Sequence, residues 1–159
     1  MKFNSSLRNF VLVLFSTLLI SACSTAKKAA VDTENDVYTG KDTVEYLANG
    51  VPDRVFFATN KSSLTTRSRD TLRKQATYLR KNKDLTVTVE GHADERGTRE
   101  YNLALGERRA NAAKDYLMTY GISGKRISVI SYGKEKPINP ASSPLAWSQN
   151  RRSVTVKAN

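Results

Sequence analysis

The sequence predicts an α/β sandwich in which two main helices pack on a mixed four-stranded sheet. Two observations lead to this prediction. Short runs of β-branched and aromatic residues alternate with two amphipathic helical stretches, and the last two strand signals follow each other with no helix predicted between them. The resulting order is β-α-β-α-β-β, and it occupies residues 53–159 of the 159-residue chain. A chain of this length is expected to hold one such domain with short segments beside it.

The first half of this domain is expected to contain a strand, a helix and a second strand. Arg54–Phe57 is a short run of aromatic and β-branched residues, which indicates a strand. Thr65 suits the N-cap of a helix over residues 66–81, in which apolar residues recur at i, i+4 and i+7 from Leu72. Leu85–Val89 alternates apolar and polar residues with period two, which predicts a half-buried strand.

The second half of the domain is expected to contain one long helix and two strands. A polar loop over residues 91–98 leads into an amphipathic helix over residues 100–120, which a glycine ends. Residues 127–132 indicate a third strand, and residues 152–157 indicate a final strand with two valines on one face. Residues 133–148 contain three prolines and are expected to form a loop.

The first 22 residues have the layout of a secretory signal peptide. A positively charged start precedes Phe10–Ile20, an apolar run of eleven residues, and two small residues follow before Cys23. The run is too short to span a bilayer, which takes about 20 residues. A buried core helix or an uncleaved anchor would be the alternatives for an apolar run of this kind.

Cys23 is the only cysteine of the chain, so an internal disulfide is excluded. Leu19–Cys23 resembles the lipobox of bacterial lipoproteins. The resemblance implies that Cys23 is lipidated and becomes the first residue of the mature chain, and several acyl chains give stable anchoring. Because Ser24 follows and not an aspartate, the resemblance also implies the outer membrane. A free thiol is the alternative.

Residues 23–52 are expected to form a lipidated N-terminus and a flexible tether. They are polar, of mixed charge and poor in large apolar residues, so they offer little core of their own. Part of the segment, around residues 44–51, would pack on the domain in an alternative interpretation. A tether lets a lipid-anchored domain reach away from its membrane.

The mature chain is expected to be basic, with 24 basic and 15 acidic residues, because Lys2 and Arg8 are the only charged residues before Cys23. This charge suits an anionic partner such as a wall polymer, lipid headgroups or nucleic acid. Export argues against nucleic acid, the basic residues are scattered, and no nucleic-acid motif is present.

The long helix carries an arginine on its apolar face. Asn102, Arg109 and Tyr116 lie nearly in line, because positions seven apart return to the same side of a helix. Leu105 flanks this line, whereas Arg108 points about 100° away. Arg109 is therefore expected to be partly desolvated and to need an anion, since a buried unpaired charge is costly.

Asp94, in the polar loop before the helix, is the expected neighbour of Arg109. A guanidinium and a carboxylate facing one pocket suit a zwitterionic amino-acid group. Arg109 would bind its carboxylate and Asp94 its ammonium. A structural ion pair that only closes the core is the alternative, and periodicity alone favours it.

Several long motifs then carry a specific resemblance, which extends over residues 54–156. The chain resembles the peptidoglycan-associated lipoproteins, within the wider family of OmpA-like C-terminal domains. The motifs that carry the likeness are residues 87–98, 100–102, 105–111, 130–137 and 148–152. The resemblance implies an outer-membrane lipoprotein whose domain faces the periplasm and binds the diaminopimelate of the peptidoglycan stem peptide. It also implies a role in the Tol-Pal system, in envelope integrity and in cell division, with a periplasmic TolB-type β-propeller protein as a partner.

The resemblance also assigns the binding residues. It places the ligand-binding aspartate on Asp94, the arginine on Arg109 and an asparagine at the helix start on Asn102. The other candidate site residues are Phe57, Ala58, Ala93 and Leu105. Members usually have an acid where this chain has Ala58, so Ala58→Asp is expected to tighten muropeptide binding.

An enzyme would have to use His92, Asp94 and Glu95 as acid, base or metal ligands. One histidine beside clustered acids is too little for a zinc site, and neither a nucleophile motif nor a P-loop is present. We therefore expect no catalysis, no metal and no cofactor other than the lipid on Cys23. A stator-type wall binder with the same domain is a closer alternative, but such proteins usually carry a transmembrane helix or a barrel.

Overall fold

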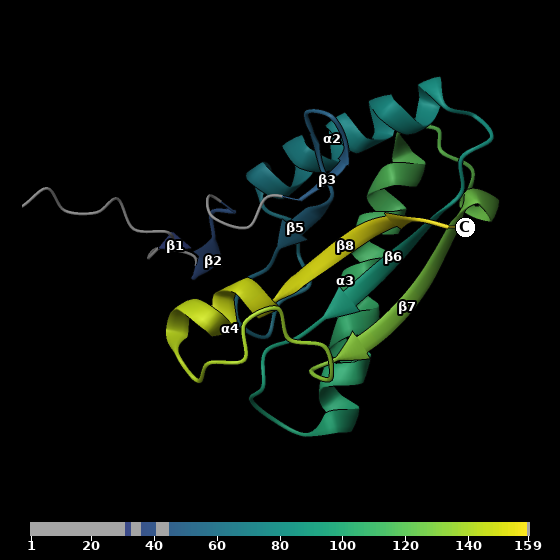
Figure 1. Cartoon of the computed structure of the whole chain (residues 1–159). Helices are drawn as coiled ribbons and strands as arrows, with labels where there is room; N and C mark the ends of the chain where they lie inside the picture. Colours follow the sequence, from purple (N-terminus) through teal and green to yellow (C-terminus); the bar gives the residue numbers. More distant parts are fainter. Residues whose placement is uncertain (1–30, 33–35, 41–44, 159) are drawn as a thin grey trace, which may run out of the picture.

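The computed structural model of the chain describes residues 31–32, 36–40 and 45–158 (Figure 1). The expected signal peptide and Cys23 lie outside the described residues. Within the part of the chain that the structure describes, no helix has the length and hydropathy needed to cross a membrane.

A mixed four-stranded sheet forms the centre of the domain, in the order β5-β8-β6-β7. Its strands are β5 (Arg54–Phe56), β6 (Val87–His92), β7 (Ile127–Gly133) and β8 (Arg152–Lys157). β8 runs antiparallel to both of its neighbours, whereas β6 and β7 are parallel. The predicted α/β sandwich on a mixed four-stranded sheet is confirmed, and so is its order of strands and long helices, to which the structure adds a short helix between the last two strands.

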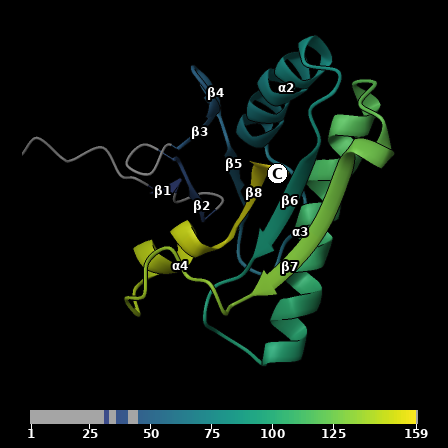
Figure 2. The same ribbon diagram turned by 45° about the vertical axis from the view of Figure 1, so that its right-hand side comes forward.

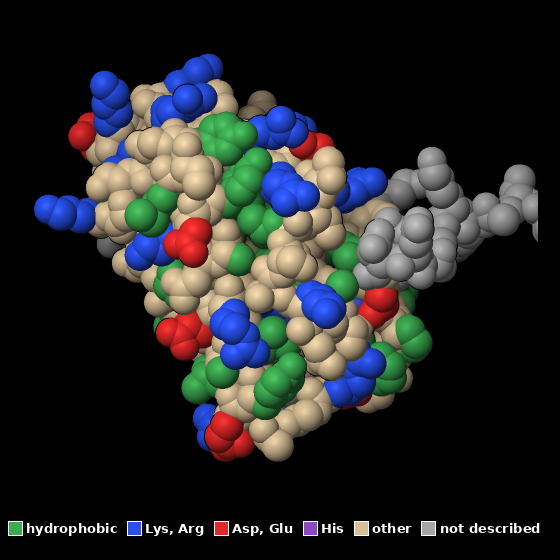
Figure 3. Space-filling view, turned by 180° about the vertical axis from the view of Figure 1, so that it is seen from behind, with side chains coloured by type: hydrophobic (Ala, Val, Ile, Leu, Met, Phe, Trp, Pro, Cys, Tyr) green, Lys and Arg blue, Asp and Glu red, His purple; other side chains and the backbone are tan. Residues whose placement is uncertain are grey.

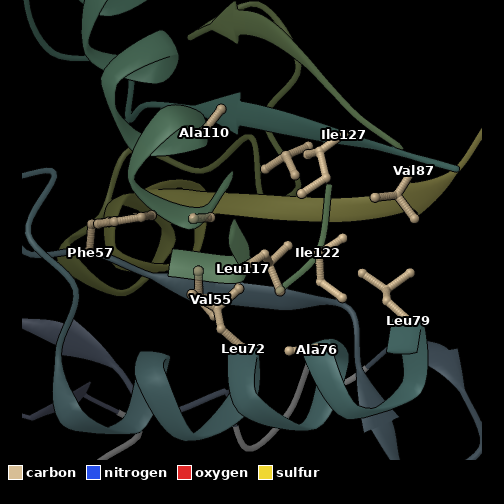
Figure 4. Packing of buried hydrophobic residues seen from close by; sticks show 12 residues of the cluster. Val55, Phe57, Leu72, Ala76, Leu79, Val87, Ala110, Leu117, Ile122 and Ile127 are labelled. Carbon is tan, nitrogen blue, oxygen red and sulfur yellow. The ribbon is translucent and has the colours of Figure 1, made fainter. Parts of the chain in front are cut away.

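Two long helices, α2 (Thr66–Lys81) and α3 (Arg99–Thr119), pack on the same face of this sheet (Figures 1 and 2). Thr65 caps α2 by accepting a hydrogen bond from the Ser68 backbone N–H, as predicted, and Thr98 caps α3 in the same way. A short 3-10 helix, Gly124–Arg126, precedes β7. The hydrophobic core lies between the helices and the sheet (Figure 4), and it includes Val55, Leu72, Leu79, Val89, Leu117 and Ile127.

A contact between two glycines brings the end of β6 against α3. A Cβ atom on Gly91 would lie only 1.9 Å from the carbonyl oxygen of Gly106, so neither strand nor helix tolerates a side chain here. This close approach sets the loop after β6 beside the first half of α3. It therefore positions the expected ligand residues relative to one another.

The expected loop over residues 133–148 is partly wrong, because its end belongs to a short helix, α4 (Pro144–Asn150). Ser143 caps this helix by accepting a hydrogen bond from the Ala146 backbone N–H. Pro144 stands in the first turn, where a helix loses no hydrogen bond by having a proline. The prolines thus mark the start of a helix as well as a turn.

Part of the expected tether packs on the domain. It forms two small antiparallel pairs, β1 (Val31–Asp32) with β2 (Val37–Tyr38) and β3 (Tyr46–Ala48) with β4 (Val51–Pro52). The Tyr38 side chain is fully buried and meets the Phe56 ring edge to face at 4.9 Å. Leu47 is also buried. The described residues from 36 onward are therefore anchored by apolar side chains, which the polar composition of the segment obscured.

Candidate functional site

Three polypeptide segments meet at one end of the sheet. They are residues 57–61 after β5, residues 93–98 after β6, and the junction between α4 and β8. Pairing of Phe56 with Arg152 and of Gly91 with Ser153 brings the ends of β5 and β6 beside the start of β8. The segments far apart in sequence therefore gather at this end, where α3 also begins (Figure 2).

Arg109 is fully buried on α3, as its helical phase predicted. Its guanidinium donates from Nε to the carbonyl of Lys61 at 2.9 Å, from Nη1 to that of His92 at 2.8 Å, and from Nη2 to that of Ala58 at 3.1 Å. The Phe57 ring lies against it, with 5.3 Å between the guanidinium carbon and the ring centroid. Backbone carbonyl dipoles thus take the place of the expected anion.

The cation keeps hydrogen-bonding capacity. A guanidinium carries five N–H donors, and the three carbonyls use one on each nitrogen of Arg109. One N–H on Nη1 and one on Nη2 are therefore left without a partner among the described residues. Burial, followed by repulsion from Arg151, lowers the pKa of Arg109 to about 9, so the group is protonated at neutral pH. Such a group suits the carboxylate of a ligand.

Asp94 is buried in the loop after β6, but it does not pair directly with Arg109 within the described structure. Its carboxylate accepts from Arg96 Nε at 3.1 Å, from Arg96 Nη2 at 2.7 Å and from the Arg96 backbone N–H at 3.1 Å. Arg151 Nη1 donates to it at 3.3 Å. Burial raises the pKa of Asp94, but the hydrogen bonds from Arg96 and Arg151 outweigh it and hold the pKa below its ordinary value.

Arg151 is a second buried arginine of the site, and the sequence interpretation did not single it out. Its Nε donates to the carbonyl of Phe57 at 3.0 Å, and its Nη2 donates to the backbone carbonyl of Asp36 at 2.5 Å. The same Nη2 lies 3.0 Å from the Asp36 carboxylate. The adjacent pair Arg151 and Arg152, placed at the start of a strand, was the available signal, because neighbouring strand residues face opposite sides.

The remaining predicted residues line or brace this end of the sheet. Asn102 is buried and donates from Nδ2 to the carbonyls of Arg96 and Thr98, at 2.8 and 3.1 Å, so it holds the loop and does not touch Arg109. Leu105 is buried one helical turn before Arg109. Ala93 is also buried, and its backbone N–H donates to the carbonyl of Gly133 at 2.7 Å.

The loop after β6 is also fastened to α4. Trp147 Nε1 donates to the Glu95 carboxylate at 2.7 Å, and Ser142 donates to the same group at 3.0 Å. These hydrogen bonds lower the pKa of Glu95. The Arg96 guanidinium stacks over the Trp147 ring at 4.3 Å while it binds Asp94. Trp147 therefore anchors the loop.

His92 is buried beside the site, and neither of its ring nitrogens has a hydrogen-bond partner among the described residues. Burial and the nearby charges of Arg152 and Lys136 lower the pKa of His92 to about 3, so the imidazole is neutral at pH 7. Among the described residues, no group of three or more histidine, cysteine, aspartate or glutamate side chains is placed to hold a metal ion.

The surface around the site offers two further features. A cavity of about 450 Å³ lies between the start of α3 and the end of β7, and its lining includes Tyr132 but neither Asp94 nor Arg109. On the face seen in Figure 3, Lys and Arg side chains are spread among polar, apolar and acidic ones. The positive charge is scattered there and does not form one continuous patch.

Comparisons with known proteins identify the family of the chain. The model of the OmpA family matches residues 56–151. A peptidoglycan-associated lipoprotein from Rhizobium meliloti is 44% identical over 155 residues, which cover 94% of this chain and 88% of that protein. One from Agrobacterium fabrum is 53% identical over 106 residues, which cover 67% of this chain and 60% of that protein.

Solved structures give the same result. The crystal structure of the peptidoglycan-associated lipoprotein from Burkholderia pseudomallei superposes with a TM-score of 0.65 at 35% identity, covering 67% of this chain and 90% of that chain. The C-terminal domain of Helicobacter pylori MotB superposes with a TM-score of 0.63 at 22% identity, covering 67% of this chain and 84% of that chain, and it supports the fold alone. The chain therefore belongs to the OmpA family and, within it, to the peptidoglycan-associated lipoproteins.

Proposed function

We propose that this chain binds peptidoglycan non-covalently through the diaminopimelate residue of the stem peptide. The observation that carries the proposal is Arg109, a buried cation whose hydrogen bonds within the described residues go to three carbonyl oxygens, which leaves two N–H groups for a ligand. Diaminopimelate keeps one amino-acid end free of the peptide backbone. That end has the carboxylate and the ammonium that an arginine and an aspartate recognise together.

In the proposed complex, Arg109 binds the ligand carboxylate and Asp94 binds the ammonium. Without a ligand, the Arg96 guanidinium is paired with the Asp94 carboxylate. The Arg96 side chain is 41% exposed, whereas the Asp94 side chain is only 9% exposed. Ligand binding therefore exchanges one cation on Asp94 for another. Because Arg109 is fully covered, a ligand is expected to reach it only after neighbouring side chains move.

The other candidate residues position these two groups. The Ala58 carbonyl and the Phe57 ring hold the Arg109 guanidinium, and Asn102 holds the loop that carries Asp94. Leu105 and Ala93 contribute buried apolar surface at the same end of the sheet. The site is thus expected to bind and not to catalyse.

We further propose that the protein is anchored in the outer membrane by lipid on Cys23, with its domain in the periplasm. Support comes from the lipobox-like Leu19–Cys23 and from relatives that are named lipoproteins. Anchoring at one end and wall binding at the other would tether the membrane to the wall. In the Tol-Pal system, this would support envelope integrity and cell division, with a TolB-type β-propeller competing for the wall-binding surface.

A pulldown on purified peptidoglycan tests the wall-binding site. Asp94→Asn and Arg109→Gln are expected to lose binding. Free diaminopimelate is expected to compete with peptidoglycan for the unmodified protein. Arg108→Gln is the matched control, because Arg108 is exposed on the same helix and adjacent in sequence. Thermal unfolding of each variant shows whether it is folded. Uncompeted binding by folded Asp94 and Arg109 variants would sink the site assignment.

Lipidation has a separate test. The unmodified protein is expected to incorporate radioactive palmitate in cells and to fractionate with the outer membrane. Cys23→Ser is expected to remain unlabelled and to leave the membrane fraction, while purified Cys23→Ser protein still binds peptidoglycan. Labelling of the Cys23→Ser variant would contradict the assignment of Cys23 as the lipid anchor, and it would leave the proposed binding site unaffected.

A further inference from the structure

The segment before the domain reaches the site and brings a carboxylate to it. Asp36 lies directly before β2 and has a left-handed backbone, with φ of 51°, a conformation that aspartate tolerates better than most residues. The two residues that follow are buried, and Val37, Tyr38 and Phe56 form a small apolar cluster against which Ala58 packs. The position of Asp36 is therefore fixed by its buried neighbours.

The Asp36 side chain contacts two residues of the site. Its carboxylate accepts a hydrogen bond from the Thr59 hydroxyl and forms an ion pair with Arg151. Thr59 directly follows Ala58, whose carbonyl holds Arg109. Arg96, which binds Asp94, also donates to the Thr59 hydroxyl at 3.3 Å. Asp36 thus stands in the same hydrogen-bonded network as Asp94, and the chain neighbours Ala58 and Thr59 connect it to Arg109.

The two carboxylates of this network differ in access. Arg151 lies between them, with Nη1 toward Asp94 and Nη2 toward Asp36. The Asp94 side chain is 9% exposed and already accepts from two arginines, whereas the Asp36 side chain is 50% exposed. A cation that approaches from solvent therefore meets Asp36 with a smaller cost in desolvation and rearrangement.

We propose that Asp36 is a ligand-binding residue that accepts the ammonium of the amino-acid end together with Asp94. The segment of residues 36–38 is then part of the binding site and not of the tether. This inference rests on the proposed function, because it assumes that the ligand carboxylate binds Arg109. It adds a residue outside residues 56–151, the part of the chain that matches the OmpA family model.

Calorimetry with a diaminopimelate-containing muropeptide tests the proposal on the mature chain. Asp36→Asn is expected to weaken binding about ten-fold, the usual effect of losing a hydrogen bond to a charged group. Tyr38→Ala keeps the carboxylate but removes the buried side chain that fixes the segment, so it is expected to weaken binding as well. Asp84→Asn, an exposed acid between α2 and β6, is the control and is expected to bind normally.

A ligand change separates contact from structural support. The same muropeptide with its free diaminopimelate amine acetylated has no ammonium. The unmodified protein is expected to lose affinity for it, and Asp36→Asn is expected to lose much less on the same change, because the interacting carboxylate is already gone. Strictly additive losses would overturn the contact between Asp36 and the ammonium.

The outcomes also separate this proposal from the one on which it rests. Unchanged or tighter binding by Asp36→Asn, with binding lost in Asp94→Asn and Arg109→Gln, would overturn the role of Asp36 alone. Normal binding by folded variants at all three positions would overturn the proposed site and the role of Asp36 with it.

Discussion

Arg109 and Arg151 are both buried at the same end of the sheet, yet their surroundings are opposite. Three backbone carbonyls hold Arg109, and it forms no ion pair within the described residues. Arg151 meets two carboxylates, those of Asp94 and Asp36. The charge of Arg109 therefore remains available to an anionic ligand, whereas that of Arg151 is neutralised by the protein's own carboxylates.

The difference between the two arginines explains how the site can be held together and still bind an anionic ligand. Carbonyl dipoles satisfy hydrogen bonds without cancelling the charge, so Arg109 still attracts an anion. Carboxylates cancel the charge, so Arg151 holds Asp94 and Asp36 in place and is poorly suited to bind a ligand anion. Arg109 is accordingly the candidate for recognition, and Arg151 is the candidate for organising the acids around it.

The largest expected effect is on stability, from Arg151→Gln. The change removes the buried partner of Asp94, and breaking a buried pair costs about 3–5 kcal/mol. This is an upper value here, because Asp94 keeps Arg96 and Asp36 is half exposed. In Arg109→Gln, the amide has two N–H donors for the three neutral carbonyls, so one carbonyl is left unsatisfied and the expected loss is about 1–3 kcal/mol. Urea unfolding of both variants gives the free energies directly. A greater loss of stability for Arg109→Gln would reverse the contrast between the two arginines.

The next effect concerns His92, which is buried near these arginines but carries no charge. Its pKa is lowered to about 3 from an ordinary 6.5, by burial first and then by the charges of Arg152, Lys136 and Arg54. The Glu90 carboxylate also faces it, with 3.6 Å between His92 Nε2 and Glu90 Oε2. The unfolded chain binds this proton near pH 6.5 and the folded chain only near pH 3. Stability is therefore expected to fall as the pH drops between these values, by at most about 1.4 kcal/mol per pH unit.

Urea unfolding between pH 6.5 and 4.5 measures this dependence above the ordinary pKa of Asp94, which is 3.8. His92→Phe is expected to flatten the dependence, since it removes the titrating group. The imidazole is the only one in the chain, so its NMR signals can be followed without assignment. A normal titration near pH 6.5 in the folded protein would contradict the prediction.

The two arginines also show how far sequence reasoning reaches. Arg109 was predicted to point inward because it sits on a long helix, where the phase of one residue follows from its neighbours. Arg151 and Asp36 escaped notice because they lie in short connections, where no period relates a residue to its surroundings. The two long helices and the strands of the main sheet were predicted from their periodicity in the same way, whereas α4 was obscured by the three prolines of residues 133–148.

The direct pairing of Asp94 with Arg109 shows a second limit. Sequence order placed the two groups near each other, but it could not reveal that Asp94 pairs with Arg96 and Arg151 and not with Arg109. Nor could it show that three carbonyls from separate loops would converge on Arg109. Both features depend on how distant segments meet, and local pattern carries no information about that.

A smaller effect is expected from Trp147→Phe, which keeps the ring under Arg96 but removes the N–H that binds Glu95. The loop that carries Asp94 is then held less firmly, and peptidoglycan binding is expected to weaken by about two- to five-fold, within the usual range for one hydrogen bond. Hydrogen exchange of residues 93–98 is expected to speed up. Glu95→Gln keeps an acceptor oxygen, so it is the milder control, and an equal loss in both variants would argue against the hydrogen bond.

The smallest effect is expected from Ala58→Asp, which adds a carboxylate to the residue whose backbone carbonyl holds Arg109. The new carboxylate is expected to tighten muropeptide binding a few-fold, about the value of an exposed ionic contact, because it adds an acceptor for the ammonium. The gain is expected to be larger in the Asp36→Asn background, where the acceptor on the neighbouring segment is missing. Calorimetry of the single and double variants measures both gains. A neutral or harmful result in both backgrounds would remove the side chain of residue 58 from the site.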